Sequence, residues 1–352
     1  MNDYFCVLPF FGYEFHSQGG KHCCLLPVNY NIDSIRQSIL DGKRSDFCSA
    51  CWKIEDAGLV SDRKLKNSAL DFYWDRDIRY IEEDVKQGKY KTIMVKNITS
   101  NTCNSTCVTC GSIASSAWAP LEQKMNLTPS RTSMMTKEQI DNNLEFKDLI
   151  TLNFVGGEPL YEKLNFYILE KLIENKNDTC FIQITTNGST GITENNRSLL
   201  RKFKNINFNV SIDGVGKVFE YLRYPLQWND LLENLDLFRS ITKNVSVSYT
   251  TSNLNVLYHH DMIEWFHQQG LPYHCNPVIT PQYFRPNALP QKIKEEIFKR
   301  YGKTDDLKFF LKEEHTPQDD IDFCTMLSKI KQQDLVKGIS CKDYLPELVS
   351  LF

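Results

Sequence analysis

The chain has 352 residues, of which 41% are hydrophobic and 24% are charged, as expected for a globular protein with a full core and more than one module. Lysine and arginine total 41 against 44 aspartates and glutamates, and this formal net charge of −3 disfavours a nucleic-acid partner. No stretch reaches the roughly 18 apolar residues of a membrane span, and the first residues lack the basic and apolar runs of a signal peptide, so we expect a cytoplasmic protein without membrane contact.

Residues 1–85 contain short apolar runs that Gly, Pro and Asn interrupt. The stretch HSQGGKHCCL, residues 16–25, predicts a turn between two short strands. Residues 34–43 have helical spacing and a glycine stop, and residues 71–89 predict a charged amphipathic helix that links two modules. We therefore expect residues 1–85 to form a small cysteine-rich module.

From residue 90 onward, strand-like runs alternate with helical segments, which predicts an α/β fold with a parallel sheet and crossover helices over residues 86–285. The six predicted strands span residues 90–98, 149–157, 180–189, 206–214, 244–253 and 272–279. The predicted helices between them span residues 162–176, 195–203, 228–241 and 260–270. Most of the strands end in loops rich in Gly, Asn, Asp, Ser or Cys, and in parallel α/β folds these carboxyl ends build the functional site.

The last part of the chain, residues 286–352, is helical in pattern and charged. Its three predicted helices span residues 290–303, 305–314 and 320–338. We expect these helices to form a C-terminal cap that covers the core.

Twelve cysteines are present, and in a long cytosolic chain metal or cluster ligation explains them better than a disulfide framework. The segment NITSNTCNSTCVTCGS places Cys103, Cys107 and Cys110 with the spacing Cys-x-x-x-Cys-x-x-Cys. Three thiolates are one too few for a structural zinc site, which takes four ligands. Four scattered cysteines are expected to be buried or incidental thiols: Cys180, Cys275, Cys324 and Cys341.

Polar motifs follow the next predicted strands in order: GGEP, TTNG, SIDG, EYLRYP and TTSN. Two adjacent glycines let a ligand approach the backbone closely, and carboxylate and guanidinium groups bind ammonium and carboxylate groups. The candidate binding residues in these motifs are Gly156, Gly157, Glu158, Asn187, Ser211, Asp213, Arg223 and Asn253.

The cysteine spacing together with these motifs resembles the radical S-adenosylmethionine (SAM) superfamily. The resemblance implies a partial (β/α)6 TIM-like barrel and a 4Fe–4S cluster held by Cys103, Cys107 and Cys110, the catalytic and metal-ligating residues. One iron would stay open and bind S-adenosylmethionine. Reductive cleavage would then give a 5′-deoxyadenosyl radical that abstracts hydrogen from a substrate, with electrons from a flavodoxin- or ferredoxin-type reductant protein.

The same resemblance assigns parts of S-adenosylmethionine to the motifs. The GGEP edge would bind the methionine amino group, with Glu158 as countercharge. Ser211 and Asp213 would bond the ribose hydroxyls, and Arg223 the methionine carboxylate. Asn253 would contact the adenine or the ribose. The residue before the third cysteine is usually aromatic in the superfamily but is Thr109 here, so adenine stacking must come from elsewhere.

A second group of cysteines precedes the barrel, with Cys6, Cys23 or Cys24, and then Cys48-x-x-Cys51 as four candidate ligands. The group looks like a twitch or SPASM-type module with an auxiliary 4Fe–4S cluster, although such modules usually follow the barrel. A zinc site is the alternative. Neighbours in an extended strand point to opposite faces, so we expect one of Cys23 and Cys24 to ligate and favour Cys23.

Three kinds of function fit this pattern. The first is a radical SAM oxidoreductase or maturase that modifies a peptide, as in ribosomal natural products. The second is a radical SAM enzyme that acts on a small molecule such as a sugar or nucleotide derivative. The third is a non-catalytic zinc or iron–sulfur scaffold, which has no need for the ammonium- and ribose-binding motifs.

Overall fold

The computed structural model describes residues 3–17, 19–27, 29–56, 58, 60–74, 77–131, 134–311 and 314–352. These residues contain an eight-stranded sheet in the order β2-β1-β3-β4-β5-β6-β7-β8, in which every neighbouring pair is parallel except β1 and β2. The strands are β1 (Gly12–His16), β2 (Gly19–Lys21), β3 (Met94–Ile98), β4 (Thr151–Val155), β5 (Phe181–Thr186), β6 (Ile206–Ser211), β7 (Val245–Thr251) and β8 (Tyr273–Pro277). The sheet does not close on itself, which is the architecture of a partial TIM-like barrel and confirms the predicted fold class.

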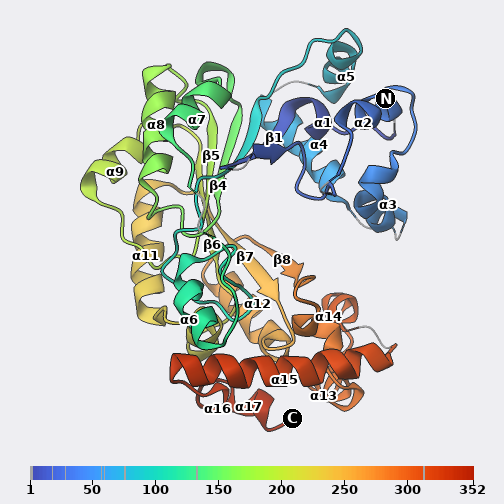
Figure 1. Ribbon diagram of the computed structural model, residues 1–352, viewed down its shortest axis with the longest axis vertical. Coiled ribbons are helices and arrows are strands. Elements are labelled where there is room, and N and C mark those ends of the chain that lie inside the picture. Colours follow the sequence, from blue (N-terminus) through green and yellow to red (C-terminus); the bar gives the residue numbers. More distant parts are fainter. Residues whose placement is uncertain are drawn as a thin grey trace.

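All six predicted barrel strands are present as β3 to β8, and a helix lies in each of the four predicted helical segments. These helices are α8 (Lys163–Glu174), α9 (Glu194–Leu200), α11 (Trp228–Ile241) and α12 (His259–Gln268). Helices α8, α9 and α11 lie on one side of the sheet (Figure 1). Because a crossover helix links each pair of neighbouring parallel strands, the strands' carboxyl ends all meet at one rim.

The two faces of the sheet differ in chemistry. Strands β4, β5 and β7 alternate residue by residue between buried and half-exposed positions. The buried set is apolar, as with Leu152, Ile184 and Val247, and packs with the crossover helices in the main core. The half-exposed set on the inner face is mostly polar: Lys96, Asn153, Gln183, Thr185, Asn207, Ser246, Ser248 and Thr250. Bulky branched side chains usually fill a barrel interior. Here the side chains of the inner face are instead polar and half-exposed, so their hydrogen-bonding groups are available to a ligand.

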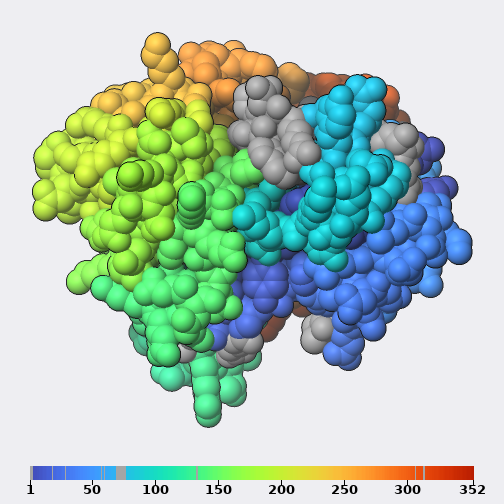
Figure 2. All heavy atoms as spheres, turned by 90° about the horizontal axis from the view of Figure 1, so that it is seen from above, coloured from blue at the N-terminus to red at the C-terminus, as the bar shows by residue number. Residues whose placement is uncertain are grey.

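The N-terminal segment extends the barrel sheet. The predicted hairpin at residues 16–25 is confirmed by β1 and β2, and β1 also pairs in parallel with β3. Its helices are α1 (Leu8–Phe11), α2 (Ile32–Leu40), α3 (Ser49–Asp56), α4 (Asp62–Trp74) and α5 (Ile78–Lys86). In Figure 2 this segment, in blue and cyan, lies beside the green segment of the first barrel helices.

The prediction of one helix over residues 71–89 is wrong. The segment is divided between the end of α4 at Trp74 and α5, which begins at Ile78; residues 75 and 76 lie outside the described part. Asp77 has non-helical backbone angles and accepts a hydrogen bond from the Arg79 N–H, so it caps the new helix. Charge periodicity alone did not reveal this cap.

The C-terminal segment is helical, as predicted, with α13 (Gln291–Tyr301), α14 (Asp305–Phe310), α15 (Pro317–Lys337), α16 (Cys341–Tyr344) and α17 (Pro346–Val349). The predicted helix over 305–314 reaches two residues, 312 and 313, that lie outside the described part. Helix α15 runs along one end of the molecule (Figure 1). It begins with a capping box at Thr316 and ends at Gly338, whose left-handed backbone suits glycine.

Within the described part of residues 86–285, three α-helices lie in segments where no element was predicted: α6 (Ala119–Lys124), α7 (Lys137–Asn143) and α10 (Lys217–Leu222). None of the helices in the described ranges is both long enough and apolar enough to span a membrane.

Candidate active site at the carboxyl ends of the strands

The three cysteines of the Cys-x-x-x-Cys-x-x-Cys segment lie in the loop that follows β3. The Ser105 hydroxyl joins two of them, with its Oγ 3.3 Å from Cys103 Sγ and 3.4 Å from Cys107 Sγ. Burial, together with the neighbouring Cys107 and Cys103, raises the pKa of the Cys110 thiol to about 12. Burial also raises the pKa of Cys107. A raised pKa keeps a thiol protonated at neutral pH. A cationic metal centre would stabilise the thiolate form of these cysteines and so make them ligands.

Contacts from distant parts of the chain hold this loop in shape. The N–H of Thr106 donates to the Tyr224 carbonyl at 2.6 Å, and the N–H of Val108 donates to the Leu222 carbonyl at 2.8 Å. The indole of Trp118 donates to the Cys107 carbonyl at 3.1 Å. The loop therefore has one defined conformation, as a ligand loop requires.

The glycines of GGEP are required by close packing against the cysteine loop. Gly156 has φ +119°, and a Cβ there would lie 2.7 Å from the Ser100 carbonyl oxygen. A Cβ on Gly157 would lie 2.1 Å from the Thr102 carbonyl oxygen. The Glu158 N–H donates to that same carbonyl at 2.7 Å, so the two strand-end loops form one unit.

Replacing Gly157 by alanine is expected to destabilise the protein by about 1–3 kcal/mol, because the new methyl group would collide with backbone that cannot rotate away. Thermal unfolding measures the effect. Gly191→Ala is the matched control, since a Cβ there has no neighbour closer than 3.9 Å. Equal unfolding temperatures for the two variants would contradict the packing argument.

Glu158 is 1% exposed, and its carboxylate is already engaged within the chain. It accepts hydrogen bonds from the Leu160 N–H, the Thr186 hydroxyl and the Asn187 N–H, at 3.0, 2.8 and 2.7 Å. Burial raises its pKa, against these hydrogen bonds. A ligand ammonium that paired with Glu158 would have to share the carboxylate oxygens with these three donors. The role of Glu158 as a countercharge therefore stays a prediction.

Arg223 and Asp213 form an almost buried ion pair, with 2.7 Å between Nη2 and Oδ2. Asp213 also accepts the Thr250 N–H at 2.8 Å, and Arg223 Nη1 lies 4.0 Å from Cys107 Sγ. The buried Nε of Arg223 has no hydrogen-bond partner among the residues described. The guanidinium thus lies beside the thiols with one donor unused.

The remaining predicted residues divide into two groups. Asn187 lies at the site, with its Nδ2 4.0 Å from Cys103 Sγ and 2.8 Å from Asn104 Oδ1. Ser211 is half-buried at the carboxyl end of β6. Asn253 is fully buried and donates to the Tyr283 carbonyl at 2.8 Å. Glu158, Asn187 and Arg223 contact the cysteine loop directly. Ser211 ends β6 and Asn253 follows β7 at the same rim, and the binding roles of all these residues stay predictions.

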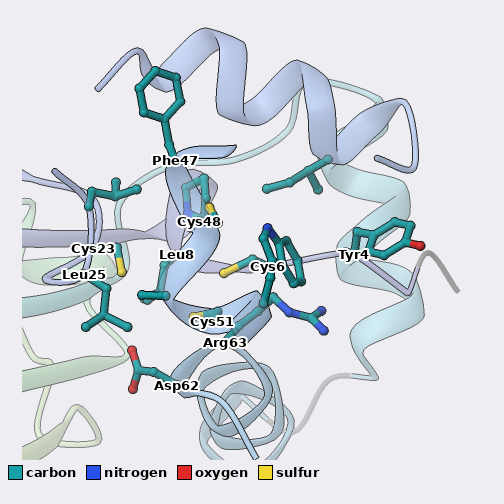
Figure 3. A pocket seen from close by; sticks show the side chains of 15 residues that line it. Tyr4, Cys6, Leu8, Cys23, Leu25, Phe47, Cys48, Cys51, Asp62 and Arg63 are labelled. Carbon is teal, nitrogen blue, oxygen red and sulfur yellow. The ribbon is translucent and has the colours of Figure 1, made fainter. Parts of the chain in front are cut away.

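A second group of thiols lines a pocket in the N-terminal segment (Figure 3). Cys6, Cys48 and Cys51 gather on one side of this pocket, and Cys23 enters from the other. Burial raises the pKa of Cys6, to which Cys48 and Cys51 add, and burial raises the pKa of Cys48 to about 11. The four predicted ligands therefore line one pocket, and thiols are the donors that zinc and iron–sulfur clusters take.

The two adjacent cysteines face different surroundings. Cys23 lines the thiol pocket, whereas Cys24 is absent from its lining and contributes with Cys23 to a neighbouring pocket beside Glu14 and Lys96. A ligand atom from each of Cys23, Cys24 and Asp62 lies within 4.8 Å of the others. Both cysteines lie after β2, outside any strand, so the alternation of side chains along a strand does not decide between them, and the choice of Cys23 stays a prediction.

Sequence reasoning missed the residues of α15 that hold the cysteine loop. Lys337 Nζ donates to the Thr106 carbonyl at 2.8 Å, and Gln333 Nε2 donates to the Val108 carbonyl at 3.1 Å. Burial lowers the pKa of Lys337 to about 8, while Cys107 and Asp334 act in the opposite direction. These partners are more than 200 residues apart in sequence, and no local motif marks them.

Comparison with known proteins agrees with the geometry. Residues 97–267 match the model of the "Radical SAM superfamily". No curated protein matches the chain. A domain of this superfamily implies S-adenosylmethionine and a 4Fe–4S cluster, and the match supports an enzyme of that class.

Solved structures with limited similarity include two proteins with bound S-adenosylmethionine. Native anSMEcpe with bound AdoMet is 16% identical with a TM-score of 0.43, over 70% of this chain and 62% of that one. Streptococcus suis SuiB bound to S-adenosylmethionine is 12% identical with a TM-score of 0.38, over 63% of this chain and 47% of that one. The chain thus spans less than two thirds of the length of either protein. Over residues 97–267, just under half of the chain, the sequence is thus similar to a radical SAM superfamily domain.

Proposed function

We propose that the protein is a radical SAM enzyme whose first cluster is held by Cys103, Cys107 and Cys110. The observation that carries the proposal is the joining of this three-thiol loop to the GGEP backbone and to Arg223 at one rim. A 4Fe–4S cluster bound there would keep one iron open for S-adenosylmethionine and would supply the electron for its reductive cleavage.

In this proposal, the chain's own residues bind and orient the cosubstrate. The backbone at Gly156 and Gly157 would receive the methionine amino group, and Arg223 would bind the carboxylate with its unused Nε. Asp213 holds that guanidinium in place and, with Ser211, would face the ribose. Asn187 lies next to Cys103 and would close the site on its other side.

The test is anaerobic incubation of iron- and sulfide-reconstituted protein with dithionite and S-adenosylmethionine. We expect 5′-deoxyadenosine to form, measured by liquid chromatography, and none to form when either reagent is omitted. Protein that holds its full iron complement but yields no 5′-deoxyadenosine would contradict the proposal. In the cell, a flavodoxin- or ferredoxin-type protein would supply the electron.

Replacing Arg223 by lysine is expected to raise the KM for S-adenosylmethionine about 10–100-fold, because lysine keeps the charge but loses the planar donor set. Steady-state formation of 5′-deoxyadenosine measures the effect. Arg201→Lys, at an exposed position on the helical side of the fold, is the control. An unchanged KM with unchanged iron content would remove Arg223 from the binding site.

We propose that the substrate is a peptide, and the polar inner face of the sheet supports this. Hydrogen-bonding side chains line five adjacent strands, and those of Asn153, Gln183 and Asn207 are in register with one another. The row continues through Ser246, which donates to Asn207 and Asn209, and through Ser248, which contacts His274 at 3.3 Å. Strands about 4.8 Å apart give this row a span of about 19 Å, which matches about six residues of extended peptide.

The peptide proposal is tested with short peptides encoded beside the gene, incubated with the reduced enzyme and S-adenosylmethionine. A mass change in such a peptide is expected. A mass change in a sugar or nucleotide derivative, with no peptide modified, would favour the small-molecule alternative instead.

We further propose that Cys6, Cys23, Cys48 and Cys51 hold an auxiliary 4Fe–4S cluster in a twitch- or SPASM-like module over residues 1–85. The radical SAM domain would then extend over residues 86–285, with a C-terminal cap over residues 286–352. The shared pocket of the four thiols supports an auxiliary centre, and zinc at the same four sulfurs is the alternative outcome of an iron determination.

A further inference from the structure

Lys337, on the C-terminal helix α15, is a buried cation that contacts the loop of Cys103, Cys107 and Cys110. It is 9% exposed, and its ammonium donates to the Thr106 carbonyl at 2.8 Å and contacts the Gln333 side-chain oxygen at 3.3 Å. The ammonium also lies over the rings of Trp118 and Tyr224, 4.6 and 5.7 Å from their centroids. Thr106 immediately precedes the cysteine ligand Cys107, and the Trp118 indole bonds the Cys107 carbonyl. Lys337 is therefore built into the supporting layer of the three-thiol loop.

The charge of Lys337 has no paired carboxylate. Among the ion pairs of the described residues, none involves its ammonium, whereas the nearby cation Arg223 is paired with Asp213. Asp334, one turn earlier on α15, is engaged by the Tyr221 hydroxyl and by the Cys341 N–H. An unpaired buried charge is strongly unfavourable in a folded protein, so its persistence calls for a compensating anion.

The loop that Lys337 contacts carries groups that supply such an anion, since Thr106, whose carbonyl accepts from the ammonium at 2.8 Å, directly precedes the proposed ligand Cys107. The thiols of Cys107 and Cys110 are two of the three groups whose charge would stabilise the ammonium, and Asp334 is the third. Three thiolates carry more negative charge than the oxidised iron–sulfur core carries positive charge, so the ligated unit is net negative. Each electron it accepts adds to that negative charge.

We infer that Lys337 is a positioning residue that supplies the buried positive charge balancing the cluster held by Cys103, Cys107 and Cys110, and that it thereby favours cluster reduction. The inference rests on the proposed function but concerns a residue outside the family motifs. Reduction potentials of iron–sulfur centres depend on net charge and on nearby hydrogen bonds. A fixed cation behind the ligand loop makes the more negative, reduced state easier to reach.

The test compares the wild type with Lys337→Met, which keeps the length of the side chain and removes its charge, and Lys337→Arg, which keeps the charge. Gln333→Leu is the matched control, since it removes one hydrogen bond to the same loop and one to Lys337 without changing charge. The readout is an anaerobic redox titration of reconstituted protein, followed by electron paramagnetic resonance and independent of turnover.

At a fixed potential, Lys337→Met is expected to lower the ratio of reduced to oxidised first cluster about tenfold, or about 59 mV for a one-electron couple. Lys337→Arg and Gln333→Leu are expected to stay within about threefold of the wild type. A ratio unchanged in Lys337→Met, or lowered equally in Gln333→Leu, would overturn the inference and leave Lys337 a role in holding the loop only.

A second measurement separates charge compensation from folding. Without iron the thiols are neutral and the lysine charge is uncompensated, so apoprotein carrying Lys337→Met is expected to unfold no earlier than apoprotein carrying Gln333→Leu. After reconstitution the order should reverse, with Lys337→Met the less stable. Apoprotein that fails to fold only with Lys337→Met would contradict the inference. Wild-type protein that binds no iron would instead contradict the proposed function.

Discussion

Replacing Cys107 by alanine is expected to abolish 5′-deoxyadenosine formation and to remove the first cluster, with about four irons lost per chain. Cys107 has the central place in the site, since its sulfur contacts Ser105 and lies near Arg223, and its carbonyl is bonded by Trp118. Loss of a residue that only supports a metal ligand typically costs 10–100-fold in affinity or activity. Loss of the ligand itself should therefore cost more than about 100-fold.

Cys324→Ala is the matched control for this change. Cys324 is an exposed thiol on α15, outside both groups of clustered cysteines, so its loss should leave iron content and product formation unchanged. If Cys107→Ala kept the first cluster and the activity, the assignment of the three-cysteine loop would be wrong. If both variants lost activity, general thiol damage would be the explanation.

Replacing Cys51 by alanine is expected to lower the iron content from about eight to about four per chain, because one of four auxiliary ligands is missing. The first cluster, in a different part of the chain, should keep its cleavage of S-adenosylmethionine without substrate. Turnover of the true substrate should be lost. Iron and sulfide analysis with parallel product assays measures both effects.

The adjacent cysteines provide an internal control for this second site. Cys23 lines the thiol pocket and Cys24 does not, so Cys23→Ala should behave like Cys51→Ala while Cys24→Ala keeps about eight irons. The reverse result would reassign the ligand. About four irons in the wild type, together with one zinc, would replace the auxiliary iron–sulfur cluster by the zinc alternative.

The barrel was predictable because its signals are local. Most of the strands are short runs rich in apolar or β-branched residues, and α11 begins and ends at the predicted residues because its leucines recur at helical spacing. Residues such as Gly156 and Asn187 were predictable because each directly follows a strand, whereas Arg223 follows helix α10. Charge periodicity, by contrast, does not show where a helix is interrupted, and the cap at Asp77 divides one predicted helix.

The support of the site was not predictable from sequence. Lys337 and Gln333 reach the cysteine loop from a helix more than 200 residues away, and only the packing of α15 against the barrel brings them there. Asn253 is a second example. Its Nδ2 donates to the carbonyl of Tyr283, 30 residues later in the chain, and its buried Oδ1 has no hydrogen-bond partner among the described residues. Its position after a strand did not reveal either feature.

The first cluster can be examined directly by electron paramagnetic resonance of anaerobically reduced protein, before and after S-adenosylmethionine is added. A Cys51→Ala background removes the auxiliary signal. The three-thiol loop predicts that the cosubstrate binds iron and changes the spectrum of the remaining cluster. A spectrum that is the same with and without S-adenosylmethionine would show that no iron at this loop is open, and it would contradict the account.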